Sequence, residues 1–283
     1  MEWDPTQFFR DDETPRQPFG LVVLNQPINE TVLGVLRRHA LITVCADGGA
    51  NRFFEWAKSQ CVEYLPTTIV GDMDSTRPGI RTHYANLGVN IVQDCDQYTT
   101  DLTKSLRYIR EHEREILSSS GFSSNDNLSI LILGGLGGRV DQAFSQIHHL
   151  FMMYQSQAEK KGDLYLISEE SITFVLQPGQ NTIHVPRTNR TCSANQHPSP
   201  SSPLPDEEHM EHLLEENVGI IPVSGPAKIT TSGFEWDVQD WKTEIGGQLS
   251  TSNHIRAEIV SVQTNVPVLF TVELARRLKR SAR

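Results

Sequence analysis

Two aspartates that directly follow an apolar run are the most informative residues of this chain. Asp72 and Asp74 belong to the sequence Gly-Asp-Met-Asp-Ser at residues 71–75, and residues 67–70 before it are typical of a buried strand. Two carboxylates at positions i and i+2 of a turn can face one hard cation when the residue between them, here Met73, points away. The spacing therefore indicates a magnesium site at the end of a strand, although such a sequence taken alone is more typical of an ordinary turn.

Similar clusters of acids and glycines lie at other element ends. Residues 46–51 are Ala-Asp-Gly-Gly-Ala-Asn, Asp101 opens a helical pattern, and residues 134–141 are Gly-Gly-Leu-Gly-Gly-Arg-Val-Asp. In the last cluster, the guanidinium of Arg139 suits phosphate oxygens and the carboxylate of Asp141 suits Mg²⁺. Acids, glycines and an arginine at several strand ends predict magnesium and phosphate chemistry.

Each cluster also has a purely structural interpretation, which stays open at this point. Glycines after Asp47 can simply end a strand, and Asp101 can cap the start of its helix or stabilise the helix dipole. Arg139 and Asp141 can form a salt bridge with each other. In the functional interpretation, the helix start at Asp101 offers backbone amides to a phosphate while its carboxylate faces the metal. The sequence matches neither a Walker loop nor the dinucleotide fingerprint.

Other metal ligands and nucleophiles are not supported by their spacing. His148 and His149 are adjacent in an apolar helical segment without HExxH or Cys/His spacing, which favours packing or surface roles. Ser145 lacks the Gly-x-Ser-x-Gly setting of a hydrolase nucleophile.

Residues 19–161 alternate between apolar strand-like runs and helical patterns. Such alternation predicts a mostly parallel sheet with helices on both faces, whose ligands bind at the carboxyl ends of the strands. The expected strands are residues 19–24, 41–46, 67–70, 89–92 and 128–133. The expected helices are residues 28–40, 51–58, 79–87, 101–117 and 140–155.

The pattern changes after residue 161. Residues 162–283 contain short β-rich segments separated by Pro-Gly, Ser-Gly and Gly-Gly, which predict an antiparallel sandwich or barrel. Residues 187–217 are rich in Ser, Pro and acids and poor in large apolar side chains, so we expect a disordered insertion there. Residues 1–18 are polar and expected to be flexible. The fold class is therefore an α/β domain (19–161) followed by an antiparallel β-sandwich domain (162–283).

Composition limits the partners and the compartment. The net charge of −10 argues against nucleic acid or an anionic membrane as a partner, because both would repel the average surface. The four cysteines show no CxxC spacing, the start lacks the regions of a signal peptide, and no apolar run approaches the roughly 20 residues that span a bilayer. We therefore expect a soluble, cytoplasmic protein.

Taken together, these motifs closely resemble the thiamine pyrophosphokinase family, also called thiamin diphosphokinases. The resemblance covers nearly the whole chain from about residue 19, with residues 187–217 outside it. The matching motifs lie at residues 45–52, 71–75, 96–97, 100–104, 133–142, 219–223, 231–236 and 249–253.

The resemblance implies transfer of a pyrophosphoryl group from ATP to thiamine, which gives thiamine diphosphate and AMP. It also implies Mg²⁺ and a homodimer whose active site lies between the subunits. The implied metal centre is Asp47, Asp72, Asp74 and Asp101, and the implied catalytic residues are Asp72, Asp74, Asp101 and Arg139. ATP contacts are implied for Asp47, Gly48, Asn51, Gln97, Thr100, Lys104, Arg139 and Asp141, and thiamine contacts for Trp236, Ser250 and Asn253.

Two other functions use the same residues. One is a magnesium-dependent phosphohydrolase that acts on a phosphorylated metabolite, and the other is a non-catalytic sensor of thiamine or a nucleotide. The complete set of acids argues against the sensor, and the Ser-Thr-Ser-Asn sequence at residues 250–253 argues against the hydrolase. For Trp236, packing in the sandwich core is an alternative to contact with a cationic heteroaromatic substrate.

Overall fold

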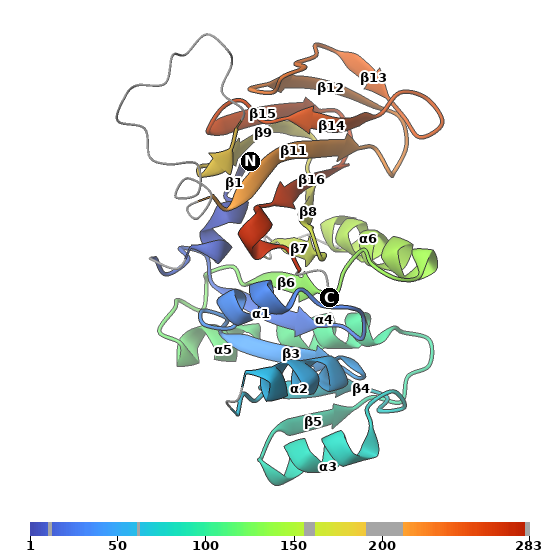
Figure 1. The fold of residues 1–283 in the computed structure, drawn as a ribbon. Coiled ribbons are helices and arrows are strands. Elements are labelled where there is room, and N and C mark those ends of the chain that lie inside the picture. Colours follow the sequence, from blue (N-terminus) through green and yellow to red (C-terminus); the bar gives the residue numbers. More distant parts are fainter. Residues whose placement is uncertain (11–12, 61–62, 156–161, 191–211, 281–283) are drawn as a thin grey trace. The chain divides into compact units, whose positions relative to one another are not determined.

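The computed structural model describes residues 1–10, 13–60, 63–155, 162–190 and 212–280. These residues form two compact units, one of residues 15–169 and one of residues 1–14 together with 170–283. The first unit alternates between strands and helices, and the second is built almost entirely of strands (Figure 1). The predicted change from alternating elements to strands is thereby confirmed. No helix among the described residues is both long enough and apolar enough to cross a bilayer.

A parallel sheet forms the core of the α/β unit. Its strands follow the order β7-β6-β2-β3-β4-β5, and each neighbouring pair is parallel. All residues of the central strands β2 and β6 are buried, as expected for strands covered on both faces. The strands are β2 (Phe19–Val23), β3 (Ile42–Ala46), β4 (Thr68–Gly71), β5 (Asn90–Gln93), β6 (Ser129–Leu133) and β7 (Leu164–Ile167).

The helices of this unit begin where the sequence supplies a cap or a proline. The side chains of Asn29 and Thr100 each accept a hydrogen bond from the N–H three residues later, and Pro78 is the first residue of its helix. The predicted helix over residues 101–117 is divided at His112, whose ring bonds to the carbonyl four residues earlier. The helices are α1 (Glu30–Leu36), α2 (Gly49–Ser59), α3 (Pro78–Asn86), α4 (Asp101–Glu111), α5 (Glu113–Ser119) and α6 (Val140–Gln155).

The chain adds strands on opposite sides of β2, so the strand order reverses between β2 and β6. From β2 the chain adds β3, β4 and β5 on one side, whereas β6 and β7 extend the sheet on the other. Right-handed connections then require α1 to α3 to cover one face and α4 and α6 the opposite face. Figure 1 shows α1 and α2 on one side of this sheet and α4 on the other. Ligands of such sheets bind beyond the carboxyl ends of the strands at this reversal.

The β unit is a sandwich of two sheets. One sheet has the order β1-β9-β15-β12-β13, and the other contains β10-β11-β16-β8 with β14 beside β11. The rings of Trp3 and Phe174, one from each sheet, lie 4.8 Å apart. The strands are β1 (Glu2–Trp3), β8 (Ser171–Leu176), β9 (Gly179–His184), β10 (Thr188–Asn189), β11 (Leu214–Ile221), β12 (Ala227–Ser232), β13 (Trp241–Thr243), β14 (Ser250–His254), β15 (Ile259–Thr264) and β16 (Val268–Leu274). All pairs are antiparallel except β1–β9 and β10–β11.

The start of the chain differs from the expectation of a flexible segment. Strand β1 pairs with β9, and a 3₁₀ helix, η1 (Pro5–Phe9), follows it. The side chains of Phe8 and Phe9 are fully buried, and Trp3 is buried as well. Three large aromatic residues within the first nine can bury enough apolar surface to order the segment, which the polar composition around them obscured.

The division between the two units and the limits of the expected insertion also differ from the predictions. Residues 164–168 were expected in the sandwich, but β7 pairs with β6 in the parallel sheet, so the division lies at residue 169. The expected insertion at residues 187–217 is ordered at both ends, because β10 pairs with β11. Its remaining residues, 191–211, lie outside the described residues.

Candidate active site

Three aspartates converge at the carboxyl edge of the parallel sheet. Asp47, Asp72 and Asp101 each offer a carboxylate oxygen, and these atoms all lie within 4.8 Å of one another. Asp47 follows β3 and Asp72 follows its parallel neighbour β4, so pairing of the two strands brings the two acids together. Gly71 leaves the room for them, because a Cβ there would lie 2.6 Å from Asp47 Cβ and 3.0 Å from Asp101 Oδ1.

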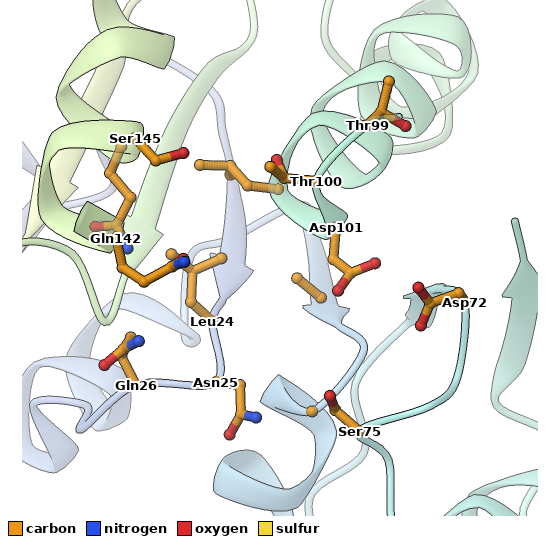
Figure 2. Close-up of a pocket in the computed structure, with 14 residues that line it drawn as sticks. Leu24, Asn25, Gln26, Asp72, Ser75, Thr99, Thr100, Asp101, Gln142 and Ser145 are labelled. Carbon is orange, nitrogen blue, oxygen red and sulfur yellow. The ribbon is translucent and has the colours of Figure 1, made fainter. Parts of the chain in front are cut away.

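A cavity of about 290 Å³ opens beside this group, at the reversal of the strand order. In Figure 2 the carboxylates of Asp72 and Asp101 border one side of the cavity, and the amides of Gln26 and Gln142 lie across from them. Among the described residues, the lining contains no lysine or arginine. The other lining residues are Leu24, Asn25, Ala46, Gly48, Ser75, Thr99, Thr100, Leu102, Ser145 and Gln146.

A buried lysine lies between two of the acids. Lys104 Nζ is 3.3 Å from Asp101 Oδ1 and 3.7 Å from Asp72 Oδ2, and its side chain is 1% exposed. Burial lowers the pKa of Lys104, but the bond to Asp101 and the charge of Asp72 outweigh this effect and raise it. Lys104 is therefore protonated. It does not line the cavity, so the structure does not place it where the ATP contact was expected.

The charge and the donor atoms of this group suit a divalent cation. With all three carboxylates ionised, three negative charges and one ammonium leave −3 + 1 = −2. Burial raises the pKa of Asp101, against the opposing effect of Lys104. The N–H of Asp74 donates to Asp72 Oδ1 at 3.2 Å and lowers the pKa of Asp72. Closely spaced oxygen donors with this net charge fit Mg²⁺.

Asp74 lies beside the group but outside it. Met73 is buried and has a left-handed backbone with φ of 69°, so it points away as expected. The Asp74 carboxylate, however, is exposed and accepts a hydrogen bond from the Ser75 hydroxyl at 2.8 Å. Its role as a metal ligand stays a prediction, because the Asp74 carboxylate is not among the three that lie close together.

The start of α4 faces the cavity. Thr99, Thr100 and Leu102 line it, and Thr100 is the residue that caps the helix, so Asp101 is not the cap. The unpaired N–H groups of a helix start bind phosphate oxygens, which supports the expected role of this segment. Gln97 lies just before it, and its Nε2 is 3.3 Å from Asp72 Oδ2. Gln97 does not line the cavity.

The glycine-rich loop before α6 does not bring its charged residues to the cavity. Arg139 and Asp141 form a bidentate salt bridge with distances of 3.1 and 2.6 Å, and both are exposed. The structure therefore contains the salt bridge that was the alternative to a role in binding phosphate and metal. Gly138 has φ of 72°, and a Cβ on it would lie 2.6 Å from Gln26 Oε1. This glycine makes room for a side chain that lines the cavity.

A buried histidine joins the two helices that border the cavity. His149 of α6 lies 2.6 Å from the Thr103 hydroxyl of α4 through Nε2 and 2.6 Å from the Ser145 carbonyl through Nδ1. Because a carbonyl only accepts, Nδ1 carries the proton, and burial lowers the pKa of His149 so that the ring stays neutral. The predicted packing role of this histidine is confirmed.

Several polar lining residues were missed by reasoning from the sequence. Asn25 and Gln26 follow β2 after one intervening residue, Leu24, so the strand-end rule that identified Asp72 also applies to them. Gln142, Ser145 and Gln146 are spaced at i, i+3 and i+4 on α6, which places them on one helix face. The helical spacing of these three polar residues could have identified them as one face of α6 from the sequence.

The residues expected at thiamine lie in the β unit. Trp236 is 56% exposed, so the alternative of a core tryptophan is wrong. Asn253 is buried, and its amide is engaged with Trp236: its Oδ1 accepts from the Trp236 N–H at 3.2 Å and its Nδ2 donates to the Trp236 carbonyl at 3.0 Å. Ser250 begins β14 and is half-buried.

Comparisons with known proteins agree with these motifs. The family model "Thiamin pyrophosphokinase, catalytic domain" matches residues 34–166, and "Thiamin pyrophosphokinase, vitamin B1 binding domain" matches residues 204–269. Thiamine pyrophosphokinase 1 of Arabidopsis thaliana is 32% identical over 276 residues, which cover 93% of this chain and 89% of the relative. The chain belongs to the thiamine pyrophosphokinase family.

Two further family members extend the comparison. Thiamine pyrophosphokinase 1 of Oryza sativa subsp. japonica is 31% identical, with 90% of this chain and 87% of the relative covered. The solved structure of thiamin pyrophosphokinase from Candida albicans has a TM-score of 0.76 and 27% identity, covering 96% of this chain and 92% of that one. The second family model begins at residue 204, so part of the segment at 187–217 lies within the resemblance.

Proposed function

We propose that this chain is a thiamine diphosphokinase, which transfers the pyrophosphoryl group of ATP to the hydroxyl of thiamine and releases AMP. The observation that carries the proposal is the acid-bordered cavity in the part of the chain that matches the catalytic domain of the family. In this reaction the thiamine hydroxyl oxygen bonds to the β-phosphorus. The bond from that phosphorus to the oxygen bridging to the α-phosphorus breaks, and the hydroxyl proton is released.

The charge of the cavity supports the use of Mg²⁺. ATP is a polyanion, and a cavity whose described lining has two carboxylates and no basic residue repels it unless a divalent cation enters with it. Asp72 and Asp101 would hold Mg²⁺, with Asp74 as a further ligand from the motif. When bound, the ion would neutralise phosphate charge and orient the triphosphate.

The chain itself contributes positioning around this centre. Lys104 holds Asp72 and Asp101 close together although both are negative. The start of α4 offers N–H groups to phosphate oxygens, and Thr100 lines the cavity beside them. Arg139 and Asp141 would reach ATP only after their mutual salt bridge opens.

For thiamine, we propose Trp236 as the main contact. Its exposed indole offers a flat face to the cationic thiazolium ring, and Ser250 supplies a hydroxyl from the same unit. Asn253 then acts through Trp236, whose backbone it holds at both the N–H and the carbonyl.

We further propose a homodimer in the cytoplasm whose active site combines the α/β unit of one chain with the β unit of the other. Isolated mixed dimers of Asp72→Asn and Asn253→Ala chains, assayed at a thiamine concentration well below the KM of the Asn253→Ala parent, should then reach up to about half of wild-type activity, because one of their two sites inherits neither defect. Co-expression with two different tags isolates the mixed dimers. At this thiamine concentration the Asn253→Ala parent keeps only about a tenth to a fifth of wild-type activity, so mixed dimers no more active than either parent would contradict this arrangement.

Incubation of the protein with thiamine, ATP and Mg²⁺ tests the proposed activity directly. We expect equal amounts of AMP and thiamine diphosphate, with no product when thiamine is left out. ADP or free phosphate in place of AMP would indicate a kinase of another kind or a hydrolase, and binding without any product would indicate a sensor.

A further inference from the structure

The loop that carries Asp72 requires support from outside. Met73 adopts a left-handed backbone, which is uncommon for a residue with a long side chain and is maintained only where the surroundings fix it. The residues that follow turn their backbone groups toward β3 and α2. We name residues 72–77 the acid loop, because they lie between β4 and α3 and contain both aspartates.

Asp47 binds this loop with both carboxylate oxygens. Oδ2 accepts from the Ser75 N–H at 2.9 Å, and Oδ1 accepts from the Thr76 N–H at 3.0 Å and the Thr76 hydroxyl at 2.7 Å. A carboxylate has about four acceptor positions, so three of them already serve the loop. Asp47 is fully buried, and its neighbours Ala46 and Gly48 line the cavity whereas Asp47 does not.

Asn51 binds the same loop with both groups of its amide. Nδ2 donates to the Ser75 carbonyl at 2.9 Å, and Oδ1 accepts from the Arg77 N–H at 3.0 Å. Asn51 lies in the first turn of α2, is 8% exposed and does not line the cavity. Its amide is therefore committed to backbone groups of the acid loop, away from the place where a nucleotide would bind.

We infer that Asp47 and Asn51 are positioning residues: they hold the acid loop so that Asp72 faces the cavity, and neither contacts ATP. This inference rests on the proposed function for the identity of the ion that Asp72 binds. It assigns metal binding at the cavity to Asp72 and Asp101, with Asp74 as the further ligand proposed above, and it gives Asp47 the role of supporting the acid loop. Groups that orient metal ligands commonly change metal affinity when they are removed, although they do not touch the ion.

The test uses variants that weaken this support and leave every carboxylate in place. Thr76→Val removes the hydroxyl that bonds Asp47, Thr76→Ser restores a hydroxyl, and Asn51→Ala removes the second support. Thr82→Val is the matched control, because Thr82 is exposed and its hydroxyl donates a hydrogen bond to the Pro78 carbonyl within α3, away from the acid loop. Each variant is titrated with Mn²⁺ alone, followed by electron paramagnetic resonance of the free ion, and the hydrogen exchange of the acid loop is measured.

We expect Thr76→Val and Asn51→Ala to weaken Mn²⁺ binding by about 3- to 30-fold and to accelerate exchange at the acid loop, as expected for the loss of one or two supporting hydrogen bonds. Thr76→Ser should recover most of the affinity, and Thr82→Val should match the wild type. Unchanged Mn²⁺ affinity in both variants, with weaker ATP binding by Asn51→Ala in an equilibrium titration, would overturn the inference and place Asn51 at the nucleotide. None of these measurements requires turnover, so a wild type that forms no AMP would refute the proposed function and leave this inference intact.

Discussion

In each unit, an aspartate and an asparagine hold a polar loop by hydrogen bonds. The two loops differ in how far along the sequence the aspartate lies from the residues that it bonds. In the α/β unit, Asp47 and Asn51 hold the acid loop. In the β unit, Asp237 accepts from two N–H groups of the turn at residues 233–238 and from the Thr231 hydroxyl, at 3.0 to 3.2 Å. Asn253 completes this second arrangement by bonding the backbone of Trp236.

The separation in sequence decides what each loop depends on. Asp47 lies 28 and 29 positions from Ser75 and Thr76, so its bonds form only after β3 and β4 have aligned. Asp237 bonds within six positions, so most of its turn can form locally. The acid loop therefore depends on the core of its unit, whereas the turn that presents Trp236 depends mainly on its own sequence.

Asp72→Asn should have the largest effect on activity, because the amide keeps the shape of the side chain and loses the charge that would hold the proposed metal. We expect the rate of AMP formation to fall at least about 100-fold and the free energy of unfolding to change by less than about 1 kcal/mol. AMP formation across a magnesium titration and urea denaturation measure the two quantities.

Asp240→Asn is the control for this substitution, since Asp240 is an exposed aspartate with a left-handed backbone in the β unit. It should behave as the wild type in both measurements. Near-normal turnover of Asp72→Asn at limiting magnesium would contradict the metal assignment.

Asp47→Ala and Asp237→Ala compare the two supporting aspartates directly. Each removes three hydrogen bonds, but Asp47 is fully buried and leaves buried donors without a partner, whereas Asp237 is exposed and water can replace it. We expect a loss of about 3 kcal/mol for Asp47→Ala, reduced somewhat by relief of repulsion with Asp72 and Asp101, and about 1 kcal/mol or less for Asp237→Ala. Equal losses in urea denaturation would remove the distinction between the two loops.

Asn253→Ala should weaken thiamine binding without affecting the metal. The Trp236 backbone loses two bonds, so the indole is held less firmly, and we expect the KM for thiamine to rise about 5- to 10-fold. The Mn²⁺ affinity should equal that of the wild type, because the acid loop belongs to the other unit. A fall in Mn²⁺ affinity of similar size would argue against this separation of roles.

Asp163→Asn tests the pH dependence of the stability of the α/β unit. Burial raises the pKa of Asp163 from 3.8 to about 6, against the opposing charge of Arg110. Between these values the folded state keeps a proton that the unfolded state releases, so stability falls as pH rises through this window, by up to about 3 kcal/mol. The asparagine variant cannot ionise.

We therefore expect Asp163→Asn to be more stable than the wild type at pH 7 and to gain less stability on acidification from pH 6 to 4. The difference between the two urea-denaturation curves, measured across this range, isolates the residue from other titrating groups. Parallel pH profiles would show that Asp163 is ionised in the folded protein.

The sequence predicted the parallel strands well because each is a continuous apolar run bounded by polar residues. Strands β2, β3 and β6 begin and end within one residue of their predicted limits. Strand β7 was assigned to the wrong unit because a short apolar run suits either sheet, and only its pairing with β6 decides the matter.

Site residues could be predicted where their place at the end of a strand or the start of a helix brings them to the cavity. They could not be predicted where their role depends on hydrogen bonds to residues far away in the sequence. Asp72 follows a strand and Asp101 opens a helix, and both border the cavity. The roles of Asp47 and Asn51 depend on partners more than twenty positions away, which the spacing of residues does not reveal. Asp74 has the same spacing argument as Asp72, but the turn at Met73 directs its carboxylate to solvent.

Gly71 has a consequence for how this protein tolerates mutation. One of the two hydrogens on its Cα occupies the space where a Cβ would meet Asp47 and Asp101. A complete mutational scan of the chain should therefore record residue 71 as intolerant as the aspartates around it, although it offers no atom to a metal or a substrate. Residue 71 would contribute to catalysis by having no side chain, which leaves room for the two carboxylates. A search for functional residues that considers only reactive side chains would not find it.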